Sequence, residues 1–87
     1  MPRFDFLLFH DRFEDHQAEA GRRIVTAFEV DEIWYGTRRF VRNVKRSGSY
    51  LMTGSTWAGR PVTVVILSTG DPESWLAYTA WDTKRSD

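Results

Sequence analysis

The chain has 87 residues, no cysteine, and equal numbers of basic and acidic residues. A chain of this length supports one small core, so we expect a single domain over residues 1–87. The lack of cysteine excludes disulfide bonds and thiolate metal sites. No apolar run approaches the ~18 residues of a membrane span, and the N-terminal region carries charges where a signal peptide needs an apolar segment. We therefore expect a soluble, cytoplasmic protein that does not bind a membrane.

The charges are unevenly distributed along the chain. Residues 1–37 hold four arginines and eight acidic residues, whereas residues 38–87 hold eight basic and four acidic residues. A basic surface formed by the second half is suited to RNA or to an acidic partner protein. The alternative is that the two halves form solvated faces whose opposite charges cancel and that neither face binds a partner.

The first expected elements are a strand and a short helix. Residues 4–9, with the sequence FDFLLF, predict a strand with one face buried. Asp11 and Glu14 have the spacing of an N-cap residue and its reciprocal partner. The residues that follow at helical spacing are Phe13, Gln17, Ala20 and Ile24. We expect a helix over residues 12–21, with Gly21 as its C-terminal stop.

The clearest local signal is a second helix start. Thr26 and Glu29 have the spacing of a capping box, and Val25 and Val30 occupy the positions of a hydrophobic staple. We expect this helix to begin at Ala27 and to end at Gly36. Its predicted apolar face consists of Val30, Ile33 and Trp34.

The rest of the chain predicts four strands joined by short connections. Residues 39–46 alternate as a basic strand, and residues 47–49 form a turn. Residues 49–67, with the sequence SYLMTGSTWAGRPVTVVIL, predict a hairpin that turns around residues 58–60. Its second strand is β-branched and apolar, which is typical of a strand buried on both faces in the middle of a sheet. After a loop at residues 69–74, residues 75–81 predict the last strand.

These elements define an α+β fold. Consecutive strands with short turns pair antiparallel, and two preceding helices can cover one face of the resulting sheet. We expect the order β-α-α-β-β-β-β, with two N-terminal helices packed on one face of a mainly antiparallel sheet of about five strands.

Nearly the whole chain resembles the BrnT-type toxins of bacterial type II toxin–antitoxin systems, a branch of the RelE-like ribonuclease fold. The resemblance is carried by segments in a characteristic order: HQAEAG (16–21), FEVDEIWYG (28–36), RFVRN (39–43), YLMTGSTWAGRPVTVVIL (50–67) and WLAYTAW (75–81). It implies a metal-independent endoribonuclease that inhibits translation and is neutralised by a cognate antitoxin in a hetero-oligomer. The sequence departs from the family at Ser55 and Trp81, where members commonly have arginine, and agrees with it at Arg60.

Metal-free RNA cleavage requires a base, an acid and fixed positive charge at the phosphate. For charge stabilisation we select Arg60 and Arg42, because guanidinium groups bind phosphate through paired donors. Tyr50 and Tyr78 are the candidates for proton transfer. The residues expected to bind RNA or a partner are Arg38, Arg39, Lys45, Arg46, Trp57, Trp81, Lys84 and Arg85. His10 and His16 are further proton carriers.

Each of these residues also has a purely structural interpretation. On the structural interpretation, Arg60 follows a turn glycine and is only solvated. Residues 38–46 form the charged side of an edge strand, and these charges protect the edge against aggregation. Tyr50 and Tyr78 are then cross-strand packing residues. Two histidines without an acidic cluster at ligand spacing do not indicate a metal site, so we expect neither metal nor cofactor. The functional alternative to a nuclease is a catalytically silent protein- or RNA-binding module on the same fold.

Overall fold

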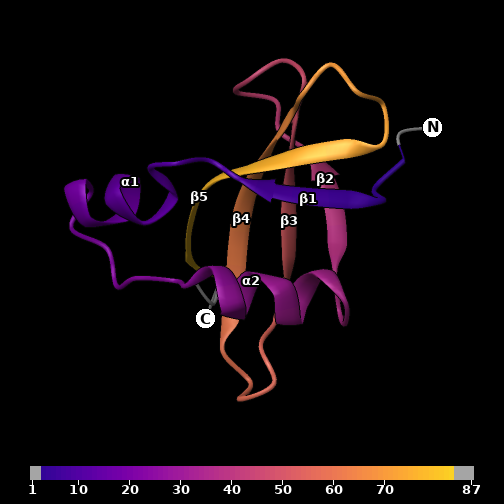
Figure 1. The fold of residues 1–87 in the computed structure, drawn as a ribbon. Coiled ribbons are helices and arrows are strands. Elements are labelled where there is room, and N and C mark those ends of the chain that lie inside the picture. The colour runs from indigo at the N-terminus through magenta and orange to yellow at the C-terminus, as the bar shows by residue number, and fades with distance from the viewer. Residues whose placement is uncertain (1–2, 84–87) are drawn as a thin grey trace.

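Residues 3–83, which the computed structural model describes, form two helices and five strands. In chain order they are β1 (Phe6–Phe9), α1 (Phe13–Glu19), α2 (Ala27–Trp34), β2 (Arg39–Arg42), β3 (Ser49–Ser55), β4 (Pro61–Ser68) and β5 (Ser74–Asp82). The predicted order of elements and the α+β class are confirmed. In Figure 1, α2 lies across the strands and α1 lies beside β5.

The five strands form one sheet in the order β1-β5-β4-β3-β2. Strands β2 to β5 pair antiparallel with their neighbours in sequence, as their short connections require. Strand β1 is parallel to β5, at the edge of the sheet. The prediction that the apolar strand occupies the middle is confirmed, because β4 is central and residues 62–66 are all buried.

The core lies between the helices and one face of the sheet. Phe13 of α1 and Ile33 of α2 join Met52, Val64 and Ala80 of the sheet in one buried cluster. Cross-strand register sets Met52, Val64 and Ala80 side by side on this face. Both helices are short, so this shared core is what stabilises them.

The start of α2 follows the sequence prediction. Thr26 Oγ1 accepts a hydrogen bond from the Glu29 backbone N–H at 3.2 Å, and Glu29 Oε1 accepts one from the Thr26 N–H at 3.1 Å. Val25 and Val30 are fully buried. The capping box and the predicted starting residue, Ala27, are therefore confirmed.

The N-cap predicted for α1 is wrong. The N-cap position is Arg12 and not Asp11, no side chain caps the helix there, and α1 ends at Glu19. Instead the side chain of Gln17, which is fully buried, donates to the Val25 carbonyl at 2.9 Å and accepts from the Val25 N–H at 2.6 Å. A tertiary contact thus stabilises α1. Gly21, at φ 69°, follows the C-cap residue Ala20 and is the predicted C-terminal stop of the helix.

Two strands are shorter than the sequence predicts. β1 begins at Phe6 rather than at residue 4, because Phe4 leaves the ladder to stack on Phe40, with ring centroids 3.7 Å apart. β2 ends at Arg42 rather than near residue 46. There Asn43 closes a turn: its side chain accepts from the Lys45 N–H at 3.2 Å, and its carbonyl accepts from the Arg46 N–H.

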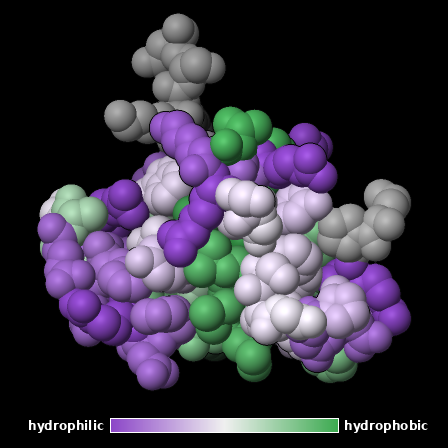
Figure 2. Space-filling model, turned by 90° about the horizontal axis from the view of Figure 1, so that it is seen from above, coloured by the Kyte–Doolittle hydropathy of each residue, from purple (hydrophilic) through white to green (hydrophobic). Residues whose placement is uncertain are grey.

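Some apolar side chains stay exposed on the sheet. Phe6 and Leu8 of β1 and Val41 of β2 are each more than half exposed. Figure 2 shows a band of hydrophobic residues on one side of the molecule, bordered by hydrophilic ones. Within residues 3–83, no helix is long and apolar enough to cross a membrane.

Candidate functional site

One end of the β2–β3 hairpin forms a basic pocket. Arg42 and Tyr50 are cross-strand partners at this end. Together with Arg46 and the turn between the strands, they line a pocket of about 430 Å³. The turn that shortens β2 thus curves the chain around the pocket and brings two arginines to its wall.

A bulge in β5 brings Tyr78 to the same end of the sheet. Ile66 pairs with Ala77 and Val65 pairs with Thr79, which leaves Tyr78 as the extra residue. Bulges change the direction of a side chain, and many lie near functional sites. The guanidinium of Arg46 lies over the Tyr78 ring, 5.0 Å from its centroid. Arg46 therefore connects the pocket with Tyr78.

Two histidines pack against Tyr78. The ring centroids of His16 and His10 lie 4.3 Å and 5.3 Å from that of Tyr78. His16 Nδ1 lies 3.1 Å from the Tyr78 carbonyl oxygen, so the N–H of that nitrogen donates to it in the matching tautomer. That bond leaves His16 Nε2 as the nitrogen able to exchange a proton with a ligand.

The assembly combines the groups that metal-free phosphate chemistry needs. Arg42 and Arg46 are cations with several donors each, suited to a phosphate. Tyr50, Tyr78 and His16 carry exchangeable protons. The ring of Tyr50 also packs against Trp75, with centroids 5.3 Å apart, which fixes its position. Three residues predicted from the sequence, Arg42, Arg46 and Tyr50, therefore line one pocket, and the predicted Tyr78 contacts Arg46 beside it.

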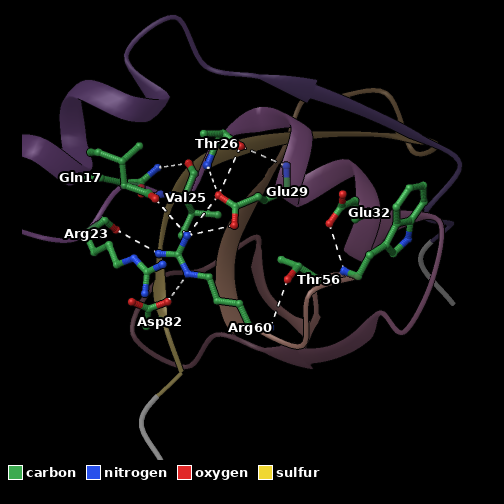
Figure 3. Close-up of polar contacts among 11 residues, drawn as sticks. Gln17, Arg23, Val25, Thr26, Glu29, Glu32, Thr56, Arg60 and Asp82 are labelled. Carbon is green, nitrogen blue, oxygen red and sulfur yellow. Dashed lines mark hydrogen bonds and ion pairs between the residues drawn. The ribbon is translucent and has the colours of Figure 1, made fainter.

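Arg60 lies at the opposite end of β3, in the connection between β3 and β4. It adjoins the pair Ser55–Pro61, whereas Tyr50 pairs with Ile66. Its side chain is only 11% exposed and forms ion pairs with Glu29 and Asp82. It also donates to the Ile24 carbonyl at 3.0 Å. Figure 3 shows Glu29 and Asp82 beside the guanidinium. Arg60 is therefore separate from the pocket and occupied by protein partners.

These contacts change the pKa values of all three groups. The hydrogen bond from Arg60 lowers the pKa of Asp82. Burial alone would raise the pKa of Glu29, but hydrogen bonds from the Thr26 backbone and from Arg60 lower it overall. The hydrogen bond to Asp82 and the pairing with Glu29 raise the pKa of Arg60. The ion pairs thus favour the charged form of each member.

The other predicted binding residues are dispersed. Arg38 folds back onto the protein, 4.8 Å from the Trp34 ring centroid, and donates to the Phe4 carbonyl. The other residues predicted to bind RNA or a partner lie on different elements: Arg39 on β2, Lys45 in the β2–β3 turn, Trp57 in the β3–β4 turn and Trp81 on β5. Lys84 and Arg85 lie outside the described residues.

Sequence reasoning missed one cationic contact. Arg22, in the connection between the helices, lies over the Trp81 ring at 4.9 Å and donates to Thr79 Oγ1 at 3.3 Å. Arg22, Arg23, Trp81 and Asp82 line an open pocket of about 400 Å³. No local pattern in the sequence joins positions this far apart.

Within residues 3–83, no group of three histidine or acidic side chains is arranged to hold a metal ion.

Comparison with known proteins yields no relative: no family model matches the chain, and neither a curated protein nor a solved structure matches it.

Proposed function

We propose that this protein is the toxin of a toxin–antitoxin pair with a RelE-like fold. In this proposal it is a metal-independent endoribonuclease that acts in the cytoplasm, inhibits translation and is neutralised by a cognate antitoxin. The sequence resemblance to BrnT-type toxins motivates the proposal. The observation that carries it is the grouping of Arg42, Arg46, Tyr50 and Tyr78 at one end of the sheet, beside His16.

The pocket suggests a division of roles. Arg42 and Arg46 bind the scissile phosphate and stabilise the charge that develops on it. Tyr50 lines the same wall and donates a proton to the 5′-oxygen that leaves the phosphorus. Tyr78, whose ring lies against Arg46, and the adjacent His16 form the second proton-carrying pair, which accepts the proton of the 2′-hydroxyl. The 2′-oxygen of the RNA forms a bond to the phosphorus as the bond from phosphorus to the 5′-oxygen breaks, so the nucleophile comes from the RNA and no metal-bound water is needed.

A test of this role combines growth and cleavage measurements on Arg42→Ala and Arg46→Ala. Both side chains belong to exposed residues, so we expect melting temperatures close to the wild type. Growth arrest on expression should be relieved, and cleavage of a single-stranded RNA by purified protein should fall about 100-fold or more for the double variant. Tyr50→Phe, which removes only the hydroxyl, should retain RNA binding and lose cleavage.

The control is Arg3→Ala. Arg3 is an exposed arginine paired with Asp5 and Glu73, and it does not line the pocket. This variant should arrest growth like the wild type. A wild type that neither arrests growth nor cleaves RNA would exclude the nuclease role. Cleavage that persists in the double variant would show that the active site lies outside this pocket.

A second candidate is a catalytically silent protein- or RNA-binding module. The observation that favours it concerns Arg60, the hairpin cation that the sequence shares with the BrnT-type toxins. The guanidinium of Arg60 forms ion pairs with Glu29 and Asp82 and is therefore occupied. Ser55 and Trp81 further replace two arginines common in that family. On this alternative the pocket binds RNA, or the antitoxin-like partner, without cleaving it.

Restoring the two arginines separates the candidates. If their loss alone silences the protein, Ser55→Arg combined with Trp81→Arg should produce RNA cleavage that the wild type lacks. Fluorescence anisotropy with a labelled single-stranded RNA measures binding in the same samples. Binding without cleavage in both proteins supports the binding module and removes those two positions as the explanation.

A further inference from the structure

The outer side of α2 carries aromatic residues that the core does not use. Phe28 on α2 and Tyr35 at the C-cap of α2 lie two turns apart and are 69% and 84% exposed. Asp31 and Glu32 lie between them at i+3 and i+4 spacing, on the same stripe. The opposite stripe of α2 is the one buried in the core. The outer stripe is therefore a surface on which two carboxylates lie between two aromatic rings.

The β3–β4 turn adds a third ring to this stripe. Trp57 is 81% exposed, and its backbone N–H donates to Glu32 Oε1 at 3.0 Å. Figure 3 shows Glu32 turned toward the turn that includes Thr56. Phe28, Asp31, Glu32, Tyr35 and Trp57 together line a small apolar pocket of about 160 Å³, which we name the acidic aromatic groove. Glu32 thus holds the turn against the helix and shapes the groove.

The groove has negative charge that the described part of the chain does not neutralise. Of the ion pairs formed within residues 3–83, none includes Asp31 or Glu32. Burial raises the pKa of Asp31, as expected for a carboxylate beside rings without a cation. Faces of tryptophan and tyrosine attract cations, and a carboxylate beside them strengthens that attraction. The chemistry of the groove therefore complements a guanidinium or ammonium group with an apolar stem.

We propose that the acidic aromatic groove is a docking site for a basic amphipathic segment of a partner protein. One arginine or lysine side chain of the segment enters the pocket, its charge on Asp31 and its stem against Trp57 and Tyr35. Apolar residues of the segment cover Phe28. The volume of about 160 Å³ matches one long side chain rather than a folded element. A nucleic acid is disfavoured, because its phosphates would face two carboxylates. This surface lies on α2, apart from the basic pocket at the β2–β3 turn.

The test uses a synthetic probe and isothermal titration calorimetry. The probe is an acetylated ten-residue peptide that alternates arginine and leucine, and the matched peptide carries citrulline, a neutral isostere, at each arginine. We expect the arginine peptide to bind and the citrulline peptide to bind at least about tenfold more weakly, as the loss of a cation–π and ion-pair contact implies. Asp31→Asn and Trp57→Ala should each weaken the arginine peptide by a similar factor.

Asp15→Asn is the control. Asp15 is also an exposed helical aspartate, on α1, so this variant removes the same charge elsewhere and should leave binding unchanged. Backbone amide NMR spectra confirm that the variants are folded and locate the peptide. Equal binding of both peptides, unchanged binding to Asp31→Asn and Trp57→Ala, or no binding at millimolar peptide would overturn the proposal. A wild type that elutes as a dimer dependent on Trp57 would assign the groove to a second copy of this chain instead. None of these readouts depends on RNA cleavage.

Discussion

At the scale of single residues, Gly54 illustrates how close packing selects a residue type. A Cβ atom at Gly54 would lie 2.6 Å from Cγ2 of Ile33 and 2.8 Å from Oγ1 of Thr37. Ile33 is fully buried on α2, so it has no room to move away. The glycine therefore allows α2 to approach β3, and the sequence pattern shows only that this position lies on a strand.

Gly54→Ala should destabilise the protein. Overpacking costs about 1–3 kcal/mol, which exceeds the ~0.4–1 kcal/mol that alanine contributes by restricting the unfolded chain. Urea unfolding followed by circular dichroism measures the change in the free energy of unfolding. Ser55→Ala, at the exposed neighbouring position, serves as control and should stay within about 0.5 kcal/mol of the wild type. Equal stability of the two variants would contradict the packing argument.

At the scale of elements, Arg60 connects the start of β4 with α2 and the end of β5. Its partners Glu29 and Asp82 lie 31 and 22 residues away in the sequence. Glu29 belongs to the capping box of α2 as well, so one carboxylate serves both the helix start and the ion pair. A catalytic role for Arg60 would require these contacts to open.

Arg60→Met, which keeps much of the apolar stem, should lower the free energy of unfolding by about 2 kcal/mol, because two carboxylates lose their partner. Thermal unfolding of both proteins tests this. The control is Arg12→Met, which removes the exposed ion pairs with Glu19 and Asp15 and should cost less than about 1 kcal/mol. If the two variants unfold at the same temperature, the Arg60 network does not stabilise the fold.

At the scale of the whole molecule, the same network makes stability depend on pH. The folded protein lowers the pKa of Glu29 and of Asp82 below their ordinary values of 4.5 and 3.8. For a depressed pKa, the added stability is present above the unfolded value and is lost as the pH falls through the folded value. Asp31, whose pKa is raised, acts in the opposite direction.

We therefore expect the melting temperature to decrease as the pH falls below 4.5 and 3.8, toward the lower pKa values that Glu29 and Asp82 have in the folded protein. The decrease should be smaller in Arg60→Met, because without the guanidinium the two carboxylates titrate closer to their ordinary values. Differential scanning calorimetry across this pH range compares the two proteins. Parallel curves for wild type and variant would assign the acid sensitivity to other groups.

The whole sheet also decides which candidate residues meet. The sequence predicts Arg42, Arg60, Tyr50 and Tyr78 as one catalytic group. The β3–β4 register separates Arg60 from Tyr50 by the length of the strand, whereas the bulge in β5 brings Tyr78 to the Tyr50 end. Arg46, predicted only to bind, joins the group through its contact with Tyr78.

The sequence by itself determined the features that depend on neighbouring residues. The capping box at Thr26, the hairpins and the buried strand β4 follow from spacings of two to four residues. Residues this close in the chain lie near one another in any helix, strand or turn, so their pattern is visible in the sequence. Only the tertiary structure decided the parallel pairing of β1 with β5, the role of Gln17 and the partners of Arg60. These contacts join positions far apart in the chain, so they form only when the core closes, and no local pattern encodes them.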